Sequence, residues 1–201
     1  MIPTLKTDRL ILRPFHAADA PRAATLFGAK EIAATTLIVP HPFSEQDALA
    51  WIASHAARAA NGEAYIFAIA LRAENELAGT AMLRVDREHR RAELSYWLGV
   101  PYWNHGYTTE AAGALIAFGF EELQLNRIWA AAMTKNPASI QVLCKAGLKY
   151  EGTFPQHVWK WGQYEDLAFF GLLRAQYQAM PTKKGKQESL ACPAQGPGIM
   201  K

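Results

Sequence analysis

The sequence predicts a single α/β domain built on a mixed, mainly antiparallel sheet with flanking helices. The chain has 201 residues, half of them hydrophobic, which is enough for a full hydrophobic core. Three apolar stretches joined by short polar turns within residues 64–100 are typical of an antiparallel meander. The alternation of strand, helix, strand and helix over residues 92–147 favours a parallel pair of strands inside that sheet.

The N-terminal part is expected to contain one strand and two helices. The stretch DRLILRPF, residues 8–15, alternates apolar and polar side chains and ends at a proline, which indicates a strand. The pattern of residues 17–28 indicates a short helix. Ser44 and Asp47 have the spacing of a capping box, so we expect a second helix from there to about residue 60.

The central strands are apolar stretches of about seven residues or more, expected at residues 64–71, 77–83, 92–100 and 127–133. An apolar helix is expected between the last two of these, from the turn at Gly106 to about Leu123.

The last elements are a helix with clear end signals and a hairpin. In residues 136–147, Asn136 is suited to the N-cap, Pro137 to the first helical position and Gly147 to the C-cap. A glycine-centred hairpin is expected in residues 159–173.

The charge of the chain does not point to nucleic acid. Of the 21 basic and 18 acidic residues, four lysines and one glutamate lie in residues 181–201, so residues 1–180 carry 17 of each sign. This balance leaves no basic stripe for a phosphate backbone. Because residues 181–201 show no apolar periodicity, we expect the domain to span residues 1–180 and the tail to be disordered and functionally silent.

The sequence offers no pattern for a membrane span or a metal site. The longest apolar runs, such as residues 64–71, fall far short of the ~20 residues that cross a bilayer, and the N-terminus has no signal-peptide core. We therefore expect a cytoplasmic protein. Cys144 and Cys192 form no CxxC pair, and the six histidines form no HxxxH or HxH pair, so we expect no metal.

The stretch WNHGYTTEAAGALIAFGF, residues 103–120, places a bare glycine and two threonines at the start of an apolar helix. A helix N-terminus has unpaired amides and a partial positive charge, so it suits a phosphate group. Gly106 lets the backbone approach a ligand closely, and Thr108 and Thr109 can add hydroxyl donors. An ordinary strand-to-helix turn capped by threonine would have the same residues, so the spacing alone leaves both interpretations open.

Four motifs occur in order along the chain. They are TDRLILRPF (7–15), AELSYWLG (92–99), YWNHGYTTEA (102–111) and NPASIQVLCKAGLKYEG (136–152). Together they resemble the GNAT superfamily of acetyl-CoA-dependent N-acetyltransferases, and within it the branch that modifies the N-termini of ribosomal proteins. The resemblance runs from residue 7 to about residue 173. It implies the GNAT fold, in which the parallel strands splay apart around the pantetheine arm of the coenzyme.

Two positions depart from the family's pattern in the phosphate turn. Pro101 stands where the superfamily usually has arginine or glutamine, and Asn104 replaces its first glycine. Because the turn is expected to hold the pyrophosphate through backbone amides, neither departure should abolish binding.

The resemblance implies acetyl-CoA as the cosubstrate and identifies the residues that would contact it. They lie at the end of one strand, in the glycine turn and at the start of two helices: Leu98, Gly99, Val100, Asn104, His105, Gly106, Tyr107, Thr108, Thr109, Asn136 and Ser139. Tyr107 is expected to pack rather than to donate a proton.

Acetylation requires a neutral amine, a polarised thioester carbonyl and a proton for the leaving thiolate. An α-amine with a pKa near ~7.7–8 is partly neutral at pH 7, whereas a lysine amine with a pKa near ~10.4 is mostly protonated. By resemblance, Glu93 is the candidate base, usually acting through water, and Ser139 is the candidate proton donor or thiol-positioning group. Alternatively, Glu93 is a surface residue paired with Arg90 or Arg91, and Ser139 only satisfies an amide of its own helix.

The acceptor side carries two candidate contacts. Trp51, from the first helices, could wall the acceptor site, and the resemblance places His157 near it. Structural packing is the alternative role of His157. Some relatives propose a glutamate one residue further on, but that position is Val158 here, so that version of the mechanism does not apply.

We therefore expect transfer of an acetyl group from acetyl-CoA to a primary amine by direct attack in a ternary complex. The preferred acceptor is the N-terminal α-amine of a protein, on the resemblance to the ribosomal branch. The alternatives are a small-molecule amine (a polyamine, an amino acid or an aminoglycoside) and a non-catalytic protein that binds the coenzyme. Glu93, Asn136 and Ser139 argue against the last. The expected partners are acetyl-CoA and the acceptor, without nucleic acid or membrane, in a monomer or homodimer.

Overall fold

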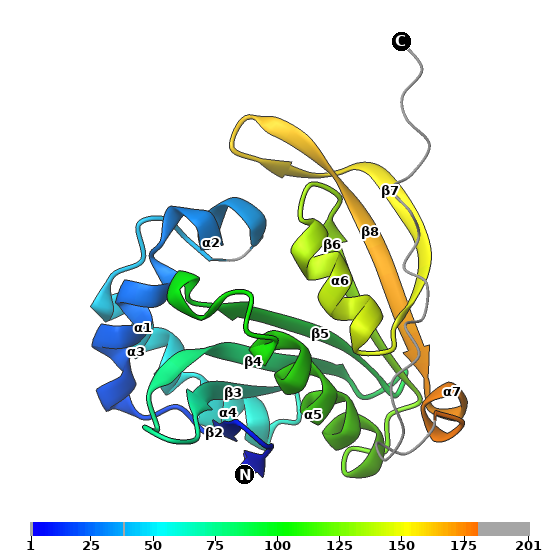
Figure 1. Ribbon diagram of the computed structural model, residues 1–201, viewed down its shortest axis with the longest axis horizontal. Helices are drawn as coiled ribbons and strands as arrows, with labels where there is room; N and C mark the ends of the chain where they lie inside the picture. The colour runs from blue at the N-terminus through cyan, green and yellow to red at the C-terminus, as the bar shows by residue number, and fades with distance from the viewer. Residues whose placement is uncertain (1, 38, 181–201) are drawn as a thin grey trace.

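The computed structural model describes residues 2–37 and 39–180 of the chain. Eight strands form one sheet in the order β1-β2-β3-β4-β5-β6-β8-β7 (Figure 1). The strands are β1 (Leu5–Lys6), β2 (Leu10–Arg13), β3 (Ala64–Leu71), β4 (Leu77–Asp86), β5 (Arg91–Leu98), β6 (Arg127–Met133), β7 (Lys149–Lys160) and β8 (Gln163–Leu173). The helices are η1 (Ala17–Asp19), α1 (Ala20–Phe27), α2 (Lys30–Thr35), α3 (Glu45–Ala53), α4 (His55–Ala60), η2 (Val100–Tyr102), α5 (Tyr107–Glu121), α6 (Pro137–Lys145) and α7 (Arg174–Gln178).

The sheet is mainly antiparallel with one parallel pair, as the sequence predicts. Strands β3, β4 and β5 form the antiparallel meander, and β5 runs parallel to β6. Helix α5 lies between these two strands along the chain and makes the crossover that a parallel pair needs. The predicted fold class is therefore confirmed.

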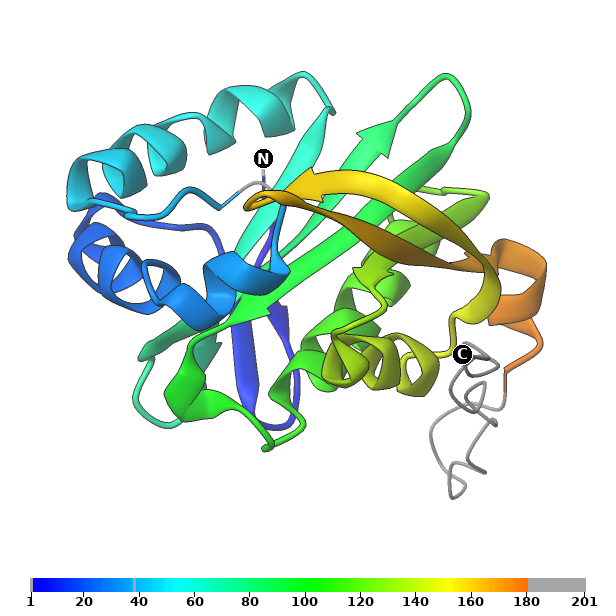
Figure 2. The same ribbon diagram turned by 90° about the horizontal axis from the view of Figure 1, so that it is seen from above.

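Strand β3 lies at the centre of the hydrophobic core. Residues 66–70 of this strand are fully buried, as expected for a strand covered on both faces. On β5, Trp97 packs against Phe27 of α1 and Trp51 of α3, whereas its neighbour Tyr96 points to the opposite face and reaches α6. Helices α1–α4 therefore cover one face of the sheet, and α5 and α6 cover the other (Figure 2).

The two parallel strands part after a short paired stretch. Only three residue pairs join β5 to β6, and the last of them is Glu93–Trp129. Both strands continue beyond that pair, β5 to Leu98 and β6 to Met133. The facing edges of these two stretches pair with no other strand in the described part of the chain. This fork is the splayed parallel pair that the sequence analysis expects, and it opens the space for the candidate site.

Several local predictions need correction. The helix that starts at the capping box of Ser44 is interrupted at Ser54, which divides it into α3 and α4. The strand expected at residues 8–15 is shorter and forms a small hairpin with β1. Helix α2 is not predicted by the sequence pattern. Ala146 is the C-cap of α6, and Gly147 follows it with a φ of 94°.

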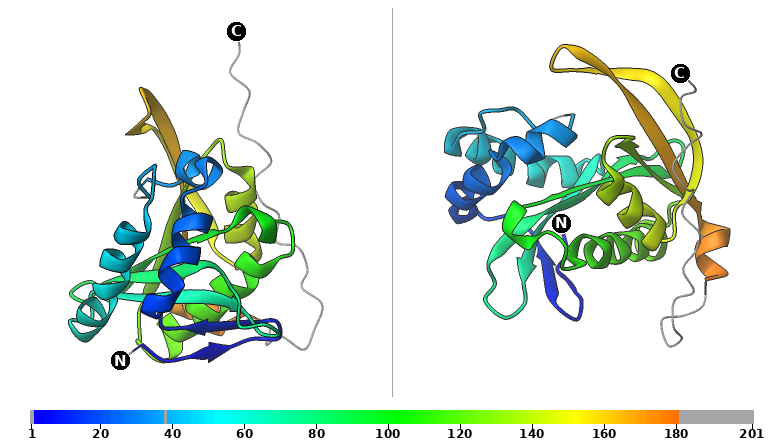
Figure 3. Two further views of the ribbon diagram at one scale, coloured as in Figure 1. Left: turned by 90° about the vertical axis from the view of Figure 1, so that its left-hand side faces the viewer. Right: turned by 45° about the horizontal axis from the view of Figure 1, so that its top comes forward.

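The β7–β8 hairpin is longer than the sequence indicates. Its turn contains Gly162, as expected for a glycine-centred hairpin, but β7 begins already at Lys149. The hairpin projects beyond the helices (Figure 3). The predictions for residues 181–201 lie outside the described residues. Within residues 2–37 and 39–180, no helix is both long and apolar enough to cross a membrane.

Candidate active site

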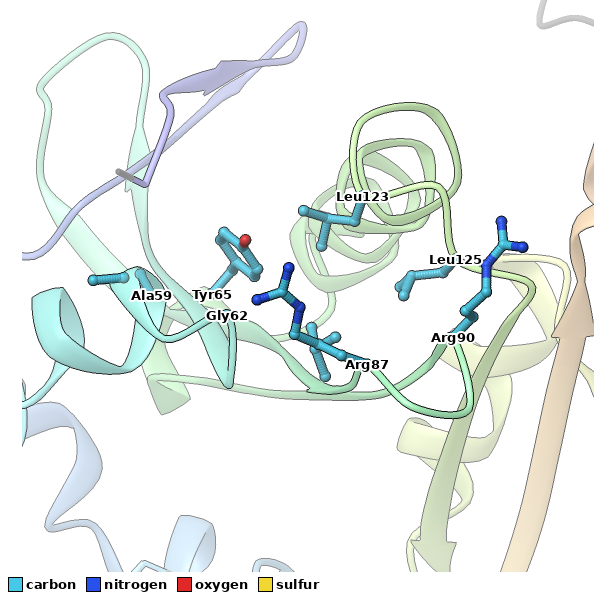
Figure 4. A pocket seen from close by; sticks show the side chains of 9 residues that line it. Ala59, Gly62, Tyr65, Arg87, Arg90, Leu123 and Leu125 are labelled. Carbon is cyan, nitrogen blue, oxygen red and sulfur yellow. The ribbon is translucent and has the colours of Figure 1, made fainter.

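A cleft of about 720 Å³ opens at the fork between β5 and β6. Its lining comes from both strands, from α2, from the start of α5 and α6, and from the β7–β8 hairpin. A smaller cavity of about 370 Å³ lies between α4, the β4–β5 turn and the end of α5 (Figure 4). Arg87 and Arg90 are part of the lining of the smaller cavity, and none of the described residues of this lining is a carboxylate or a serine. The acid–base groups expected from the sequence are therefore found at the larger cleft.

The turn before α5 has an unusual backbone that two residues make possible. Asn104 and Gly106 have φ values of 64° and 77°, in the left-handed region. Glycine adopts this region freely and asparagine tolerates it better than most residues, so Asn104 can replace the family's glycine at low cost. The first amide of α5 to donate to a backbone carbonyl is that of Glu110, which binds the oxygen of Gly106. The amides before it are left for a ligand or water.

The N-terminal motif braces this turn from behind. Arg9 Nε donates to Glu110 Oε2 at 2.7 Å, and Arg9 Nη1 donates to the His105 carbonyl oxygen at 2.8 Å. Thr7 Oγ1 donates to Glu110 Oε1 at 2.6 Å. Burial alone would raise the pKa of Glu110, but the hydrogen bonds from Thr7 and Arg9 outweigh it and lower the pKa. Arg9 and Glu110 lie inside the quoted motifs, but only the fold shows that they meet.

Glu93 lies at the fork, with its side chain about one-quarter exposed. Its Oε2 is 3.1 Å from Nη1 of Arg84, which stands directly opposite on β4. The alternative partners named from the sequence are wrong, because Arg91 pairs with Asp86 and Arg90 donates to a backbone carbonyl. The carboxylate thus has a cation on one side and the cleft on the other.

Ser139 lies in the first turn of α6, on the other side of the fork. Its amide donates to Asn136 Oδ1 at 3.1 Å, which confirms Asn136 as the N-cap. Its Oγ lies 3.1 Å from the Tyr96 hydroxyl, which also donates to the Ser139 carbonyl oxygen at 3.2 Å. Burial raises the pKa of Tyr96 well above its usual value. Sequence reasoning missed Tyr96, because no local pattern links it to a residue 43 positions away.

Trp97, α2 and the β7–β8 hairpin form another part of the cleft wall. His157 lines the cleft and packs against the rings of Phe154 and Phe169, at centroid distances of 5.3 and 5.6 Å. Trp51 is not among the described residues that line the cleft. It packs against Trp97, at a centroid distance of 5.8 Å, and Trp97 itself lines the cleft.

Most of the residues expected at the site line this one cleft: Glu93, Leu98, Asn104, Gly106, Tyr107, Thr108, Thr109, Asn136, Ser139 and His157. Besides Trp51, three others are not in the described lining: Gly99, Val100 and His105. Gly99 packs close to Leu26, and the His105 ring stacks on Tyr107. The coenzyme contacts assigned to these residues stay predictions. The described residues contain no group of three or more histidines, cysteines and carboxylates that could hold a metal.

Known proteins share this architecture. The model of the acetyltransferase (GNAT) domain family matches residues 9–149. The "Uncharacterized N-acetyltransferase YoaA" of Bacillus subtilis is 31% identical over 175 residues, which are 87% of this chain and 98% of the relative. The spermidine N(1)-acetyltransferase of Escherichia coli K12 is 27% identical over 107 residues, which are 53% of this chain and 58% of the relative.

Solved structures extend the likeness to nearly the whole described chain. A Vibrio cholerae protein described as a "putative ribosomal-protein-serine acetyltransferase" is 26% identical, with a TM-score of 0.71 over 85% of this chain and 97% of that one. The ribosomal L7/L12 α-N-protein acetyltransferase RimL, solved with coenzyme A, is 17% identical. Its TM-score is 0.78 over 85% of this chain and 98% of that one, which shows the shared fold.

Proposed function

The chain belongs to the acetyltransferase (GNAT) domain family and is an acetyl-transferring enzyme. From this premise we propose that the fork between β5 and β6 binds acetyl-CoA and that the preferred acceptor is a protein N-terminal α-amine. The observation that carries the proposal is the placement of Glu93 and Ser139 along one cleft that ends at an open helix N-terminus.

The coenzyme fits the cleft from the turn inward. The free amides at residues 104–109 suit the pyrophosphate, because they combine unpaired N–H groups with the positive end of the α5 dipole. Beyond the Glu93–Trp129 pair, the edge of β5 that faces β6 pairs with no described strand, so its backbone groups suit the amides of the pantetheine arm. The complex of RimL with coenzyme A, on the same fold, supports this assignment.

The chemistry is a direct transfer. The amine nitrogen attacks the thioester carbon, the new C–N bond forms and the C–S bond breaks. Glu93 takes the proton that the amine loses, directly or through water, and Ser139 donates a hydrogen bond to the developing thiolate. The ion pair with Arg84 holds the Glu93 carboxylate beside the cleft, where it can accept that proton. A general base of this kind contributes about 10²–10⁴-fold in rate.

The charge of the cleft favours an acceptor with one positive charge over a polyamine. Glu93 is the one carboxylate among the described lining residues, and Arg84 already neutralises it. A polyamine would bring two or more cations to a site with no spare negative charge, which costs binding energy. A peptide N-terminus brings a single amine close to its ordinary pKa. The likeness to the Vibrio cholerae protein points to the same acceptor class.

A free amino acid is the second candidate, and a specific observation favours it. The Arg84 side chain is 44% exposed and lines the cleft beside Glu93. It could pair with the carboxylate of an amino acid whose amine is held by Glu93. A peptide amine has no such carboxylate at that position, so the two acceptors can be separated experimentally.

The test is a panel of acceptors with release of free coenzyme A as the readout. The panel contains a peptide with N-terminal serine, one with N-terminal alanine, free serine and spermidine. We expect the peptides to exceed spermidine and the amino acid in kcat/KM by at least about tenfold, or about 1.4 kcal/mol. If free serine is acetylated faster than the peptides, the acceptor is a free amino acid. If spermidine is acetylated faster than the peptides, the charge of the cleft does not exclude polyamines. Binding of acetyl-CoA without transfer to any amine would overturn the catalytic proposal.

A further inference from the structure

We infer that Tyr96 is a positioning residue for Ser139, holding its hydroxyl so that it can turn toward the leaving thiolate. The inference rests on the proposed function, because it assumes that Ser139 faces the thioester sulfur. Tyr96 would act through Ser139, and the step that it would assist is the stabilisation of the departing coenzyme thiolate.

The geometry brings two hydroxyls together inside the cleft. Tyr96 lies on β5 just past the fork, and Ser139 lies in the first turn of α6, and both line the cleft. The Tyr96 oxygen is 3.1 Å from Ser139 Oγ and 3.2 Å from the Ser139 carbonyl oxygen. Both distances are within the range of a hydrogen bond.

A single phenol proton can serve only one of these two acceptors at a time. If Tyr96 donates to the carbonyl oxygen, the Ser139 hydroxyl donates to the phenol and its proton is not available to a ligand. If Tyr96 donates to Ser139 Oγ, the serine proton is free to point at a ligand. The two arrangements differ by rotation of two hydroxyl hydrogens and need no movement of heavy atoms.

Negative charge on the coenzyme sulfur selects the second arrangement. Two donors then act in series, from Tyr96 to Ser139 and from Ser139 to sulfur, and each polarises the next. Hydrogen bonds to a charged acceptor are stronger than neutral ones, so the chain gains strength as the C–S bond breaks. The interaction is therefore larger in the transition state than in the ground state, which is the condition for catalysis.

The proton stays on the phenol throughout. A thiol near pKa ~8.5 is a stronger acid than a phenol near ~10, and burial raises the Tyr96 pKa further. Transfer of the Tyr96 proton to the thiolate would be uphill. Tyr96 thus supplies a hydrogen bond, and the thiolate leaves as such or takes its proton from water.

The test is a double-mutant cycle of Tyr96→Phe and Ser139→Ala, measured with acetyl-CoA and a serine-terminal peptide. Phenylalanine keeps the ring, so the packing of β5 against α6 is retained. We expect Tyr96→Phe to lower kcat about three- to tenfold while the KM for acetyl-CoA changes less than about twofold, as for the loss of one hydrogen bond. In the Ser139→Ala background the same change should cost nothing further, because Tyr96 acts through the missing hydroxyl.

The matched control is Tyr150→Phe, which removes a phenol bonded to Thr153 at 2.9 Å, outside the described lining of the cleft. It should leave kcat unchanged. As a second readout, the Tyr96→Phe loss should be constant from about pH 6 to about pH 9, because neither hydroxyl ionises in that range. If Tyr96→Phe also lowers stability, the rates are measured below the melting temperatures of all the variants. The coupling between the two substitutions then still shows whether Tyr96 acts through Ser139.

The outcomes separate the two proposals. Additive losses, or full activity of Tyr96→Phe, would overturn the positioning role while the acetyl-transfer proposal stands. A wild-type protein that transfers acetyl to no amine would overturn the proposed function and this inference with it.

Discussion

Glu93 occupies the last paired position of β5 before the fork, opposite Trp129 on β6. This register holds its backbone between two hydrogen-bonded neighbours while the side chain reaches the cleft. The ion pair with Arg84, at 3.1 Å, orients the carboxylate from the β4 side. The pairing of β5 with its two neighbouring strands therefore fixes the position of Glu93.

The role of Glu93 makes a prediction about pH. Glu93→Gln should lower kcat/KM by about 10²–10⁴-fold at pH values below the acceptor's pKa, where most of the amine is protonated. Raising the pH should recover part of the loss, because the free amine then forms without help. The measurement is the pH–rate profile of wild type and variant with one peptide acceptor.

Glu151→Gln is the matched control for that profile. Glu151 forms an ion pair with Arg127 outside the described lining of the cleft, and its loss should not change the profile. A Glu93→Gln defect of equal size at every pH, or no defect, would mean that Glu93 is not the base.

His55 makes a prediction about stability. It is 4% exposed, packs against Phe15 and Trp51, and neither ring nitrogen has a hydrogen-bond partner in the described part of the chain. Burial, with a smaller contribution from Arg58, lowers the pKa of His55 from 6.5 to about 4. As the pH falls below 6.5 the unfolded chain binds a proton first, so stability is full above this value and is lost toward pH 4.

His55→Phe should remove this loss. A His55 pKa lowered from 6.5 to about 4 corresponds to a loss on the order of 3 kcal/mol once the pH is below both values. The variant's advantage in free energy of unfolding should therefore be larger at about pH 5 than at about pH 8. Urea denaturation at the two pH values measures it. An equal difference in free energy of unfolding between variant and wild type at both pH values would show that His55 does not remain neutral in the folded protein.

At the scale of elements, the turn between β5 and α5 is the part most specialised for a ligand. Gly106 has a φ of 77°, and a Cβ placed there would meet only Arg9 Nη2 at 3.5 Å. There is room for a side chain, but the backbone conformation disfavours one. A branched residue would relieve this strain by shifting the turn, which would move its amides out of place.

Gly106→Val should therefore weaken acetyl-CoA binding by at least about tenfold, because one or more amide contacts are lost. Gly162→Val is the matched control, since Gly162 has a φ of 86° and open space around it at the hairpin turn. Both variants carry similar backbone strain, but only the first should change the dissociation constant measured by calorimetry. Equal affinity in both would contradict the assignment of the turn to the pyrophosphate.

Elements with local signals are predictable from this sequence, and elements held by tertiary contacts are not. The Ser44–Asp47 capping box and the Asn136 cap both form as the sequence indicates. Helix α2 has no side-chain cap and is six residues long, so its packing through Ile32 and Ala33 must stabilise it. The break at Ser54 has no signal in the sequence either, since the segments on both sides of it have the same helical composition.

The same division applies to the site. Glu93, Ser139 and the glycine turn could be named because each lies in a contiguous motif. The pairs that organise them could not, because Arg9 and Glu110 are 101 positions apart and Tyr96 and Ser139 are 43 apart. Trp51 is the instructive error: an aromatic residue of the first helices is as compatible with the core behind the cleft as with its wall.

On the scale of the whole molecule, one topological feature joins all these parts. The parallel pair β5–β6 requires a crossover, and α5 supplies it, so the same connection that makes the strands parallel also aims a helix N-terminus at their fork. On their outer sides the two strands of the fork pair with antiparallel strands, β5 with β4 and β6 with β8. The order of the strands thus places the fork, and the turn before α5 and the segment after α2 complete the lining of the cleft.

The position of the acetyl group on a peptide product shows whether the enzyme prefers an N-terminal α-amine. A peptide with N-terminal serine and an internal lysine is incubated with acetyl-CoA and the protein at about pH 7, and tandem mass spectrometry locates the modification. We expect acetylation of the α-amine, with little on lysine, because only the α-amine is partly neutral at this pH. The Glu93→Gln protein should modify the same amine far more slowly. Equal acetylation of the lysine, or an unmodified peptide beside turnover of spermidine, would contradict the account.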